Sequence, residues 1–438
     1  MEKHDIFSSP SMAPKIDRYM RAVRGEIRLL ENGIPVLFEY NPNSFTACVS
    51  MWRRTGSGDE PVRYAGLSHF GEHMVFRGAN GLTSYATAEL IEGVGGTFNA
   101  FTDREQVAYH ATVLREHAPI AVEVLSKIVT APRFPARELD IERRIVLGEF
   151  NTTRDVPKDY SQDIVFGLMW PSSFGRTELG LKSVVQNVDR QTFLDFHMAQ
   201  WQPKNLFVVV TGNFDKRAVL RTLNSTLGKL SNNGKVAKQD TLEMCSGRKH
   251  VRDSLAAFHI TIAAHAPPFG EDYMNTTAVD FLLGGGSNSR LSRRVRDKEG
   301  LAYTIETEHT PYTKASAITI YSDPPPELAV FTLHVIMDEL RKLSRKEPYQ
   351  TEMRRVLNQI EIELLEKLDV ESRMGRIGRW FMATGRLVST QELIAMARKV
   401  TAADVTATAR KIFSEGISLV TMGRMKDGER IRQSDLEL

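Results

Sequence analysis

The chain contains two copies of one sequence pattern, separated by 211 residues. The first copy ends in a predicted strand, NLFVVVTGNFD, with Gly212 after it, and the second ends in GISLVTMGRMKD, with Gly423 in the same place (423 − 212 = 211). Upstream, DIERRIVLGEF aligns with EMRRVLNQIEI, so that Glu142 meets Met353 at the same offset (353 − 142 = 211). Because a repeated unit folds as one supersecondary block, the pattern predicts two similar domains.

Each copy begins with strands and continues with helices. The strands IPVLFEY, ACVSMWRRT and FHITIAAHAP alternate apolar and polar residues, which is typical of a half-buried sheet. This order predicts an α+β fold of two homologous domains, each a mixed β-sheet with helices covering one face. We expect a flexible tail at 1–16, an N-terminal domain at 17–232, a linker at 233–250 and a C-terminal domain at 251–438.

The composition is that of an ordinary globular protein, with 42% hydrophobic and 25% charged residues. The net charge is +3 and no basic cluster stands out in the sequence, which argues against nucleic-acid binding. Two distant cysteines, Cys48 and Cys245, indicate a reducing compartment rather than a disulfide scaffold. No stretch approaches the ~18 apolar residues of a membrane span, and the N-terminus lacks a secretory signal. We therefore expect a cytoplasmic protein that does not contact membranes.

The run His69-Phe70-Gly71-Glu72-His73 is an H-x-x-E-H motif, which inverts the H-E-x-x-H signature of zinc hydrolases. On a helix, His69 and His73 lie one turn apart on the same face, where both imidazoles can reach one zinc ion. Glu72 flanks that face and is placed to act on water rather than on the metal. The competing interpretation is a pair of helix histidines that are capped or partly exposed.

A third ligand is needed, because catalytic zinc usually takes three protein ligands. The best candidate is Glu149, in the predicted helix ELDIERRIVLGEF. Glu142 lies seven positions earlier (149 − 142 = 7), hence on the same face, and can orient a ligand while Glu149 binds the metal. For Glu149 alone, a solvated glutamate on an amphipathic helix is the alternative.

The two copies differ at these positions. By the offset of 211, Glu149 corresponds to Ile360 and Glu142 to Met353. The counterpart of the histidine motif falls near VDFLLGGGS, which has no histidine. The carboxylates therefore occur only in the copy that also holds both histidines, which favours a metal site in the first copy.

These motifs resemble the pitrilysin/insulysin family of inverted-motif zinc peptidases, and most of all its short-chain branch, which is similar to the mitochondrial processing peptidase. The resemblance extends from about residue 25 to 425, and the family's metal helix is matched by HFGEHMVFRG. Glu149 follows His73 by 76 positions (149 − 73), a spacing typical of the family's third ligand. The resemblance also implies that Asn99 and Ala100, in GGTFNAFTDREQVAYHATV, hold the substrate backbone.

The second copy resembles the family's Arg/Tyr segment at SRLSRRVRDKEGLAYTI, with Arg296 and Tyr303 seven positions apart (303 − 296). A cation and a phenol near zinc can bind the scissile carbonyl and stabilise the developing oxyanion. Most arginines are solvated and most tyrosines pack, so this role is implied by the resemblance and not by the residues alone.

The resemblance implies a zinc-dependent endopeptidase with one Zn²⁺ per chain, held by His69, His73 and Glu149, and with Glu72 as general base. Its substrates would be short or unfolded peptides, such as a peptide precursor. The alternative is a non-catalytic structural or binding subunit of a processing-peptidase-like heterodimer, although such subunits usually lose a ligand or the base. A zinc hydrolase of non-peptide substrates is a third possibility.

In this family, two halves of two domains each close like a clamshell around a peptide chamber. The zinc lies on one half and the Arg/Tyr pair on the other, whereas this chain is as long as one half and carries both sets. We therefore expect a twofold homodimer in which each zinc site is completed by the partner's Arg296 and Tyr303. A heterodimer with a homologous subunit is the next possibility.

Overall fold

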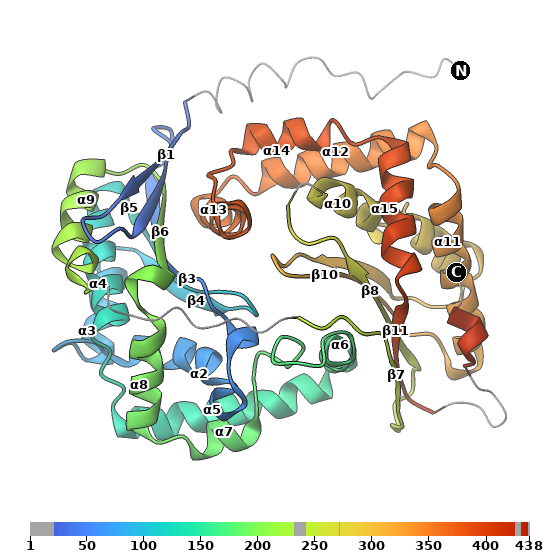
Figure 1. The fold of residues 1–438 in the computed structure, drawn as a ribbon, viewed down its shortest axis with the longest axis horizontal. Helices are drawn as coiled ribbons and strands as arrows, with labels where there is room; N and C mark the ends of the chain where they lie inside the picture. The colour runs from blue at the N-terminus through green and yellow to red at the C-terminus, as the bar shows by residue number, and fades with distance from the viewer. Residues whose placement is uncertain (1–21, 232–241, 271, 425–430, 437–438) are drawn as a thin grey trace.

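The structure is a computed structural model that describes residues 22–231, 242–270, 272–424 and 431–436. It contains two domains that lie side by side, each built on one sheet (Figure 1). The expected tail at 1–16 and the first half of the expected linker, 233–241, lie outside the described residues. Strand β7 starts at Arg248, inside the segment expected as a linker, and belongs to the second sheet.

The first sheet has six strands in the order β1-β2-β6-β3-β5-β4. All neighbours are antiparallel except β2 and β6, which are parallel. The strands are β1 (Arg24–Leu29), β2 (Pro35–Tyr40), β3 (Thr46–Arg53), β4 (Thr97–Thr102), β5 (Val107–Leu114) and β6 (Leu206–Gly212).

The second sheet repeats this topology in the order β7-β11-β8-β10-β9. Its one parallel pair, β7 with β11, corresponds to β2 with β6, and β1 has no counterpart among the described residues. The strands are β7 (Arg248–Val251), β8 (His259–Ala266), β9 (Ile305–Thr310), β10 (Ser316–Ser322) and β11 (Ile417–Met422). The expected α+β fold of two homologous domains with mixed sheets is confirmed.

The helices follow the same order in both copies, so that α4, α5, α6 and α8 correspond to α11, α12, α13 and α15. In the first copy the helices are α2 (Leu67–Met74), α3 (Ser84–Glu92), α4 (Ala118–Thr130), α5 (Ala136–Asp155), α6 (Pro157–Met169), α7 (Lys182–Asn187), α8 (Arg190–Gln200) and α9 (Lys216–Ser225). In the second they are α10 (Tyr273–Gly284), the π-helix η7 (Ser292–Lys298), α11 (Ala329–Arg345), α12 (Gln350–Glu366), α13 (Val370–Thr384), α14 (Thr390–Ala397) and α15 (Ala402–Ser414). Short 3₁₀ turns are η1 (Ser57–Asp59), η2 (Val62–Tyr64), η3 (Val75–Arg77), η4 (Arg115–His117), η5 (Pro203–Asn205), η6 (Leu227–Lys229), η8 (Pro326–Leu328) and η9 (Gln433–Leu436).

Each sheet is covered on its second face by a helix from the other domain. Helix α13 packs on β3 and β6 of the first sheet, and α6 packs on β8 and β11 of the second (Figure 1). The apolar contacts of α13 include Ile377 and Phe381 against Trp52 and Phe207. The central strands are therefore buried on both faces rather than half-buried, and every residue of β6 and β8 is buried, whereas the edge strand β1 is largely exposed.

Buried polar contacts also join the two domains. Arg373 on α13 forms a buried ion pair with Glu39 on β2, at 2.9 Å. After β4, the carboxylate of Glu105 accepts hydrogen bonds from the backbone N–H groups of Thr313 and Lys314, at 2.6 and 3.0 Å. These contacts, together with the exchanged helices, fix the two domains relative to one another.

Within the described residues, no helix combines the length and the apolar character that a membrane crossing requires.

Candidate metal centre

Helix α2, which carries the H-x-x-E-H motif, begins at a tightly fixed turn. Gly66 precedes the helix with φ +100°. The buried carboxylate of Glu60 accepts hydrogen bonds from the backbone N–H groups of Gly66 and Ser68, both at 2.6 Å. A Cβ at Gly66 would lie 2.4 Å from the carbonyl oxygen of Leu179, so only glycine fits there. These contacts fix the direction in which the histidine face points.

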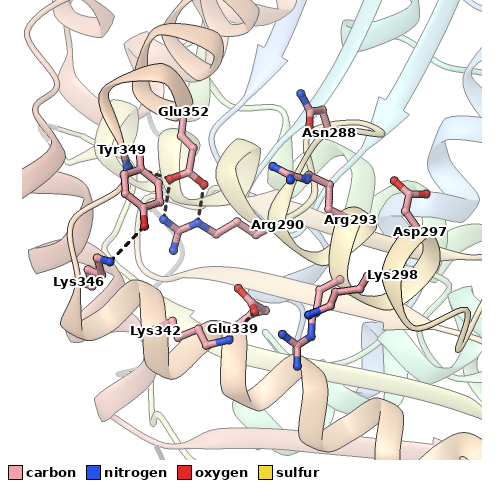
Figure 2. Close-up of a pocket in the computed structure, with 11 residues that line it drawn as sticks. Asn288, Arg290, Arg293, Asp297, Lys298, Glu339, Lys342, Lys346, Tyr349 and Glu352 are labelled. Carbon is pink, nitrogen blue, oxygen red and sulfur yellow. Dashed lines mark hydrogen bonds and ion pairs between the residues drawn. The ribbon is translucent and has the colours of Figure 1, made fainter.

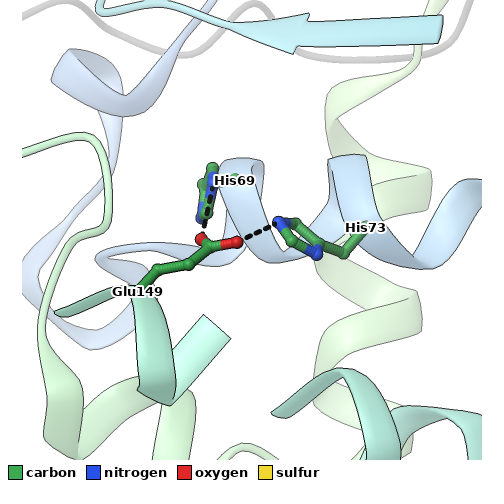
Figure 3. A group of neighbouring side chains, drawn as sticks. All are labelled: His69, His73 and Glu149. Atoms are coloured by element: carbon green, nitrogen blue, oxygen red, sulfur yellow. Dashed lines mark ion pairs between the residues drawn. The ribbon is translucent and has the colours of Figure 1, made fainter. Parts of the chain in front are cut away.

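Three donor atoms from α2 and α5 converge on one point (Figure 3). Nε2 of His69 lies 3.5 Å from Oε2 of Glu149, and Nε2 of His73 lies 3.4 Å from Oε1 of the same carboxylate. The donor atoms of the three residues all lie within 4.8 Å of one another. The structure thus brings together the two histidines and the distant glutamate that the sequence singled out.

The donors and their spacing fit zinc. Ligand atoms bound at about 2.0–2.2 Å in a tetrahedral site stand about 3.4 Å apart. Each histidine Nε2 lies at a similar separation, 3.5 or 3.4 Å, from one of the two oxygens of Glu149. Two imidazole nitrogens and one carboxylate oxygen leave a fourth position for water or substrate. The Glu149 side chain is 37% exposed, so solvent reaches the group.

His73 is oriented by charged groups behind it. Its Nδ1 lies 3.1 Å from Oε2 of the buried Glu142, and the other carboxylate oxygen of Glu142 accepts a hydrogen bond from Arg77. Arg77 is also paired with Glu138, at 3.6 Å. Because Glu142 accepts the Nδ1 proton, Nε2 of His73 carries the lone pair that a metal ion requires.

His69 lacks such an orienting group. Its Nδ1 is buried without a hydrogen-bond partner among the described residues. Burial, and to a smaller extent the neighbouring His73, lower the pKa of His69 to about 4. The ring is therefore neutral near pH 7, which is the protonation state that binds metal.

Glu72 borders a cavity of about 320 Å³ that His73 and Asn99 also line. Its carboxylate accepts hydrogen bonds from Thr102, but burial has the larger effect and raises the pKa of Glu72 above its usual value. A carboxylate with a raised pKa is a stronger proton acceptor, so this environment suits a general base.

Strand β4 forms the edge of the first sheet beside this cavity. Asn99 lines the cavity, whereas Ala100 is buried and donates its N–H to Oδ1 of Asn99, at 2.8 Å. An edge strand can pair with an extended peptide. The predicted contact between these two residues and a substrate backbone is compatible with their position, and it stays a prediction.

Arg296 and Tyr303 lie on the second domain, away from these donors in the fold. Arg296 belongs to the π-helix η7, and its Nε donates a hydrogen bond to Asp297 at 3.2 Å. Tyr303 is 87% exposed in the loop before β9. Over the described part of the chain, neither side chain bonds to a residue of the metal centre.

Sequence reasoning missed three residues that support the centre. Arg77 lies four positions after His73, so helical spacing alone could have placed it near the motif. Thr102 and Glu60 reach the site only through tertiary contacts, and their local sequence carries no comparable signal.

Two segments of the chain match known family domains. Residues 35–180 match the domain described as Insulinase (Peptidase family M16), and residues 187–360 match the domain described as Peptidase M16 inactive domain. The chain belongs to the M16 peptidase family.

Similar M16 chains include proteins that are named uncharacterized zinc proteases. One from Streptomyces coelicolor is 28% identical over 418 residues, which cover 93% of this chain and 91% of the relative. Another, YmxG of Bacillus subtilis, is 26% identical and covers 89% of this chain and 96% of its own length.

Solved structures share the M16 fold. A protease from Helicobacter pylori superposes with a TM-score of 0.84 at 19% identity and covers 91% of this chain and 99% of its own. A peptidase M16 inactive domain from Pseudomonas fluorescens superposes with a TM-score of 0.85 at 18% identity, and it covers 93% and 100%. At these identities, the likeness supports the two-domain fold alone.

The second M16 copy lacks carboxylates that correspond to the candidate donor Glu149 and to Glu142. Met353 and Ile360, the counterparts of Glu142 and Glu149, are buried apolar residues with 7% and 3% exposure. They lie within the range that matches the inactive domain. The two copies thus share a backbone plan, and the first copy alone carries the three donors.

Proposed function

We propose that this M16 chain is a zinc metalloendopeptidase of the inverted-motif class, with one zinc ion per chain. The observation that carries the proposal is the convergence of His69, His73 and Glu149 at zinc-like spacing. The zinc proteases among its relatives support the same conclusion.

The residues around the donors have complementary roles. A zinc ion held by the three donors would polarise a peptide carbonyl and lower the pKa of a bound water to about 7. The carboxylate of Glu72 accepts a proton from the attacking water and returns it to the leaving amine. Glu142 keeps His73 in the tautomer whose Nε2 faces the metal position.

The substrate in this proposal is an extended peptide that pairs with the edge strand β4, beside Asn99 and Ala100. Main-chain pairing reads backbone rather than a particular side chain, so short or unfolded peptides fit better than folded proteins. Trimming of a peptide precursor and clearance of peptide fragments both belong to this class.

A second subunit completes the site in this proposal. Arg296 and Tyr303 are exposed on the second domain and have no bonds to the metal centre of their own chain among the described residues. Two chains related by a twofold axis would close as a clamshell and place these two side chains against the partner's peptide carbonyl. A homologous subunit in place of the second copy would give a heterodimer of the same geometry.

The variant Glu72→Gln tests the function. We expect zinc content to be unchanged and hydrolysis of a peptide library to fall by about 10²–10⁴-fold, because the proton acceptor is lost while the donors remain. Cleavage products are read by mass spectrometry, and Glu89→Gln, an exposed carboxylate on α3, is the matched control. Near-normal hydrolysis by Glu72→Gln would refute the role of Glu72. A wild-type protein that binds zinc but cleaves no peptide would favour the non-catalytic subunit.

A further inference from the structure

A basic cavity lies on the second domain, between the π-helix η7, the second half of α11 and the start of α12 (Figure 2). Its volume is about 550 Å³, and six basic and three acidic side chains line it, which gives a net charge of +3. Four of the basic residues come from the run RLSRRVRDK (290–298), and the other two come from α11 and the residue that follows it. The six are Arg290, Arg293, Arg294, Lys298, Lys342 and Lys346.

Two of the three acidic groups are already engaged inside the cavity. Glu352 accepts two hydrogen bonds from Arg290, both at 2.9 Å, and this bidentate pair is nearly enclosed. Glu339 accepts a hydrogen bond from Lys342 at 2.9 Å. In each pair, a cation of the cavity wall balances the negative charge of the carboxylate.

Several cations remain without an acidic partner. Arg293 and Lys298 are exposed, and within the described residues neither side chain forms a hydrogen bond or an ion pair. The ammonium group of Lys346 donates a hydrogen bond to the phenol oxygen of Tyr349 at 3.2 Å, and it pairs with no carboxylate among the described residues. The third acid of the cavity, Asp297, is bonded to Arg296, which does not line the cavity. The positive charge is therefore available to a ligand.

A neighbouring arginine, Arg355, also lacks a hydrogen-bond acceptor for one of its nitrogens among the described residues. This nitrogen, Nη2, is buried. Arg355 interacts electrostatically with Glu352, Arg293 and Arg290. Arg290 and Arg355 thus share the carboxylate of Glu352, and Arg293 repels Arg355, an arrangement that an additional anion would stabilise.

We propose that this cavity binds a small anion that carries two or three linked phosphate groups. The planar guanidinium group of arginine can donate two hydrogen bonds to the oxygens of one phosphate. Lysine ammonium groups add positive charges, and a chain of phosphates is long enough to contact several of them at once. A cavity of this volume accommodates a triphosphate or a nucleotide, whereas a flat basic surface would favour a larger polyanion. Inorganic tripolyphosphate and a nucleoside triphosphate share this chemistry.

Calorimetric titration of the zinc-loaded chain with tripolyphosphate, and separately with ATP, tests the proposal. We expect saturable binding of one ion per chain that weakens as the salt concentration rises, because the contacts are charge–charge. Equal affinities would mean that the phosphates alone are recognised, and tighter binding of ATP would mean that the nucleoside also contacts the cavity. No saturable binding of either anion would overturn the proposal.

Charge variants locate the binding. Arg293→Gln and Lys346→Gln should each weaken tripolyphosphate binding by about five- to tenfold, whereas Glu339→Gln should tighten it, because one unit charge is removed or gained close to the ligand. The control is Lys249→Gln, an exposed lysine on β7 outside the cavity, which should leave the affinity unchanged. Equal effects of Lys249→Gln and Arg293→Gln would contradict a localised site.

The same titration separates this cavity from the metal centre. Zinc is measured before and after titration, because phosphate chains chelate metals. Binding should persist in Glu72→Gln, which the proposed function renders inactive. The binding heat could instead come from removal of zinc by the anion. In that case the heat would disappear when zinc is absent and would be unchanged in Arg293→Gln. This result would refute the cavity site.

Discussion

At the scale of single residues, His73 shows how the metal centre is built. Both of its ring nitrogens are committed, Nδ1 toward Glu142 and Nε2 toward Glu149. The carboxylate of Glu142 is buried and is itself held by Arg77. The position of the Nε2 lone pair therefore depends on a residue that is not itself a candidate ligand.

Removal of Glu142 should weaken zinc binding without removing a ligand. In Glu142→Ala, the His73 ring loses its Nδ1 acceptor, so we expect the zinc dissociation constant to rise about 10–100-fold. Competition with a fluorescent chelator measures the constant. Glu138→Ala is the control, because Glu138 pairs with the same Arg77 at 3.6 Å but has no bond to His73 within the described residues. Equal losses in the two variants would contradict the orienting role of Glu142.

The sequence singled out the three candidate ligands, which the structure brings together, because their signals are partly local. His69, Glu72 and His73 lie within five residues, and Glu149 stands out because its counterpart in the second copy is Ile360. The support of the first turn of α2 by Glu60 could not be predicted, because that hydrogen bond joins segments whose approach depends on the surrounding loops.

At the scale of elements, the exchange of helices between the domains is the feature that sequence patterns did not predict. Helix α13 lies on the first sheet so closely that a Cβ at Gly378 would stand 2.3 Å from the Trp52 ring. The alternation of apolar residues in β3 indicated a covered face, but the pattern cannot say which helix covers the other face. The π-helix η7 was likewise not expected, because its hydrogen-bond pattern has no distinct sequence signature.

Two glycines on α13 should respond in opposite ways to alanine. Gly378→Ala should lower the free energy of unfolding by about 1–3 kcal/mol, because the new methyl group meets the rigid Trp52 ring. Gly375→Ala, one turn earlier, has no atom within 4 Å of its Cβ and should raise it by about 0.5–1 kcal/mol through helix propensity. Denaturant titration measures both changes. A neutral Gly378→Ala would mean that α13 does not pack on this sheet as described.

At the scale of the whole molecule, the repeat of 211 residues correctly predicted two similar domains, and both sheets share one strand order over five strands. The repeat aligned Glu142 and Glu149 with Met353 and Ile360, which the structure places at buried positions of α12. The structure contains one chain, so the proposed homodimer stays a prediction.

Mixed dimers of differently tagged chains test whether the site is shared between subunits. A dimer of one Glu72→Gln chain and one Arg296→Ala chain should keep one complete site, and hence about half of the wild-type activity, although each parent homodimer is inactive. With both substitutions on one chain and a wild-type partner, no complete site remains and activity should be lost. If each chain supplies its own Arg296, the two results exchange, with the first dimer inactive and the second half-active.

The most direct test of the account is the position of zinc in crystals of the purified protein, measured by anomalous diffraction at the zinc absorption edge. We predict one strong peak per chain, about 2.0–2.2 Å from Nε2 of His69, Nε2 of His73 and a carboxylate oxygen of Glu149. Absence of a peak at these three atoms in zinc-supplemented protein, or a peak held by other residues, would contradict it.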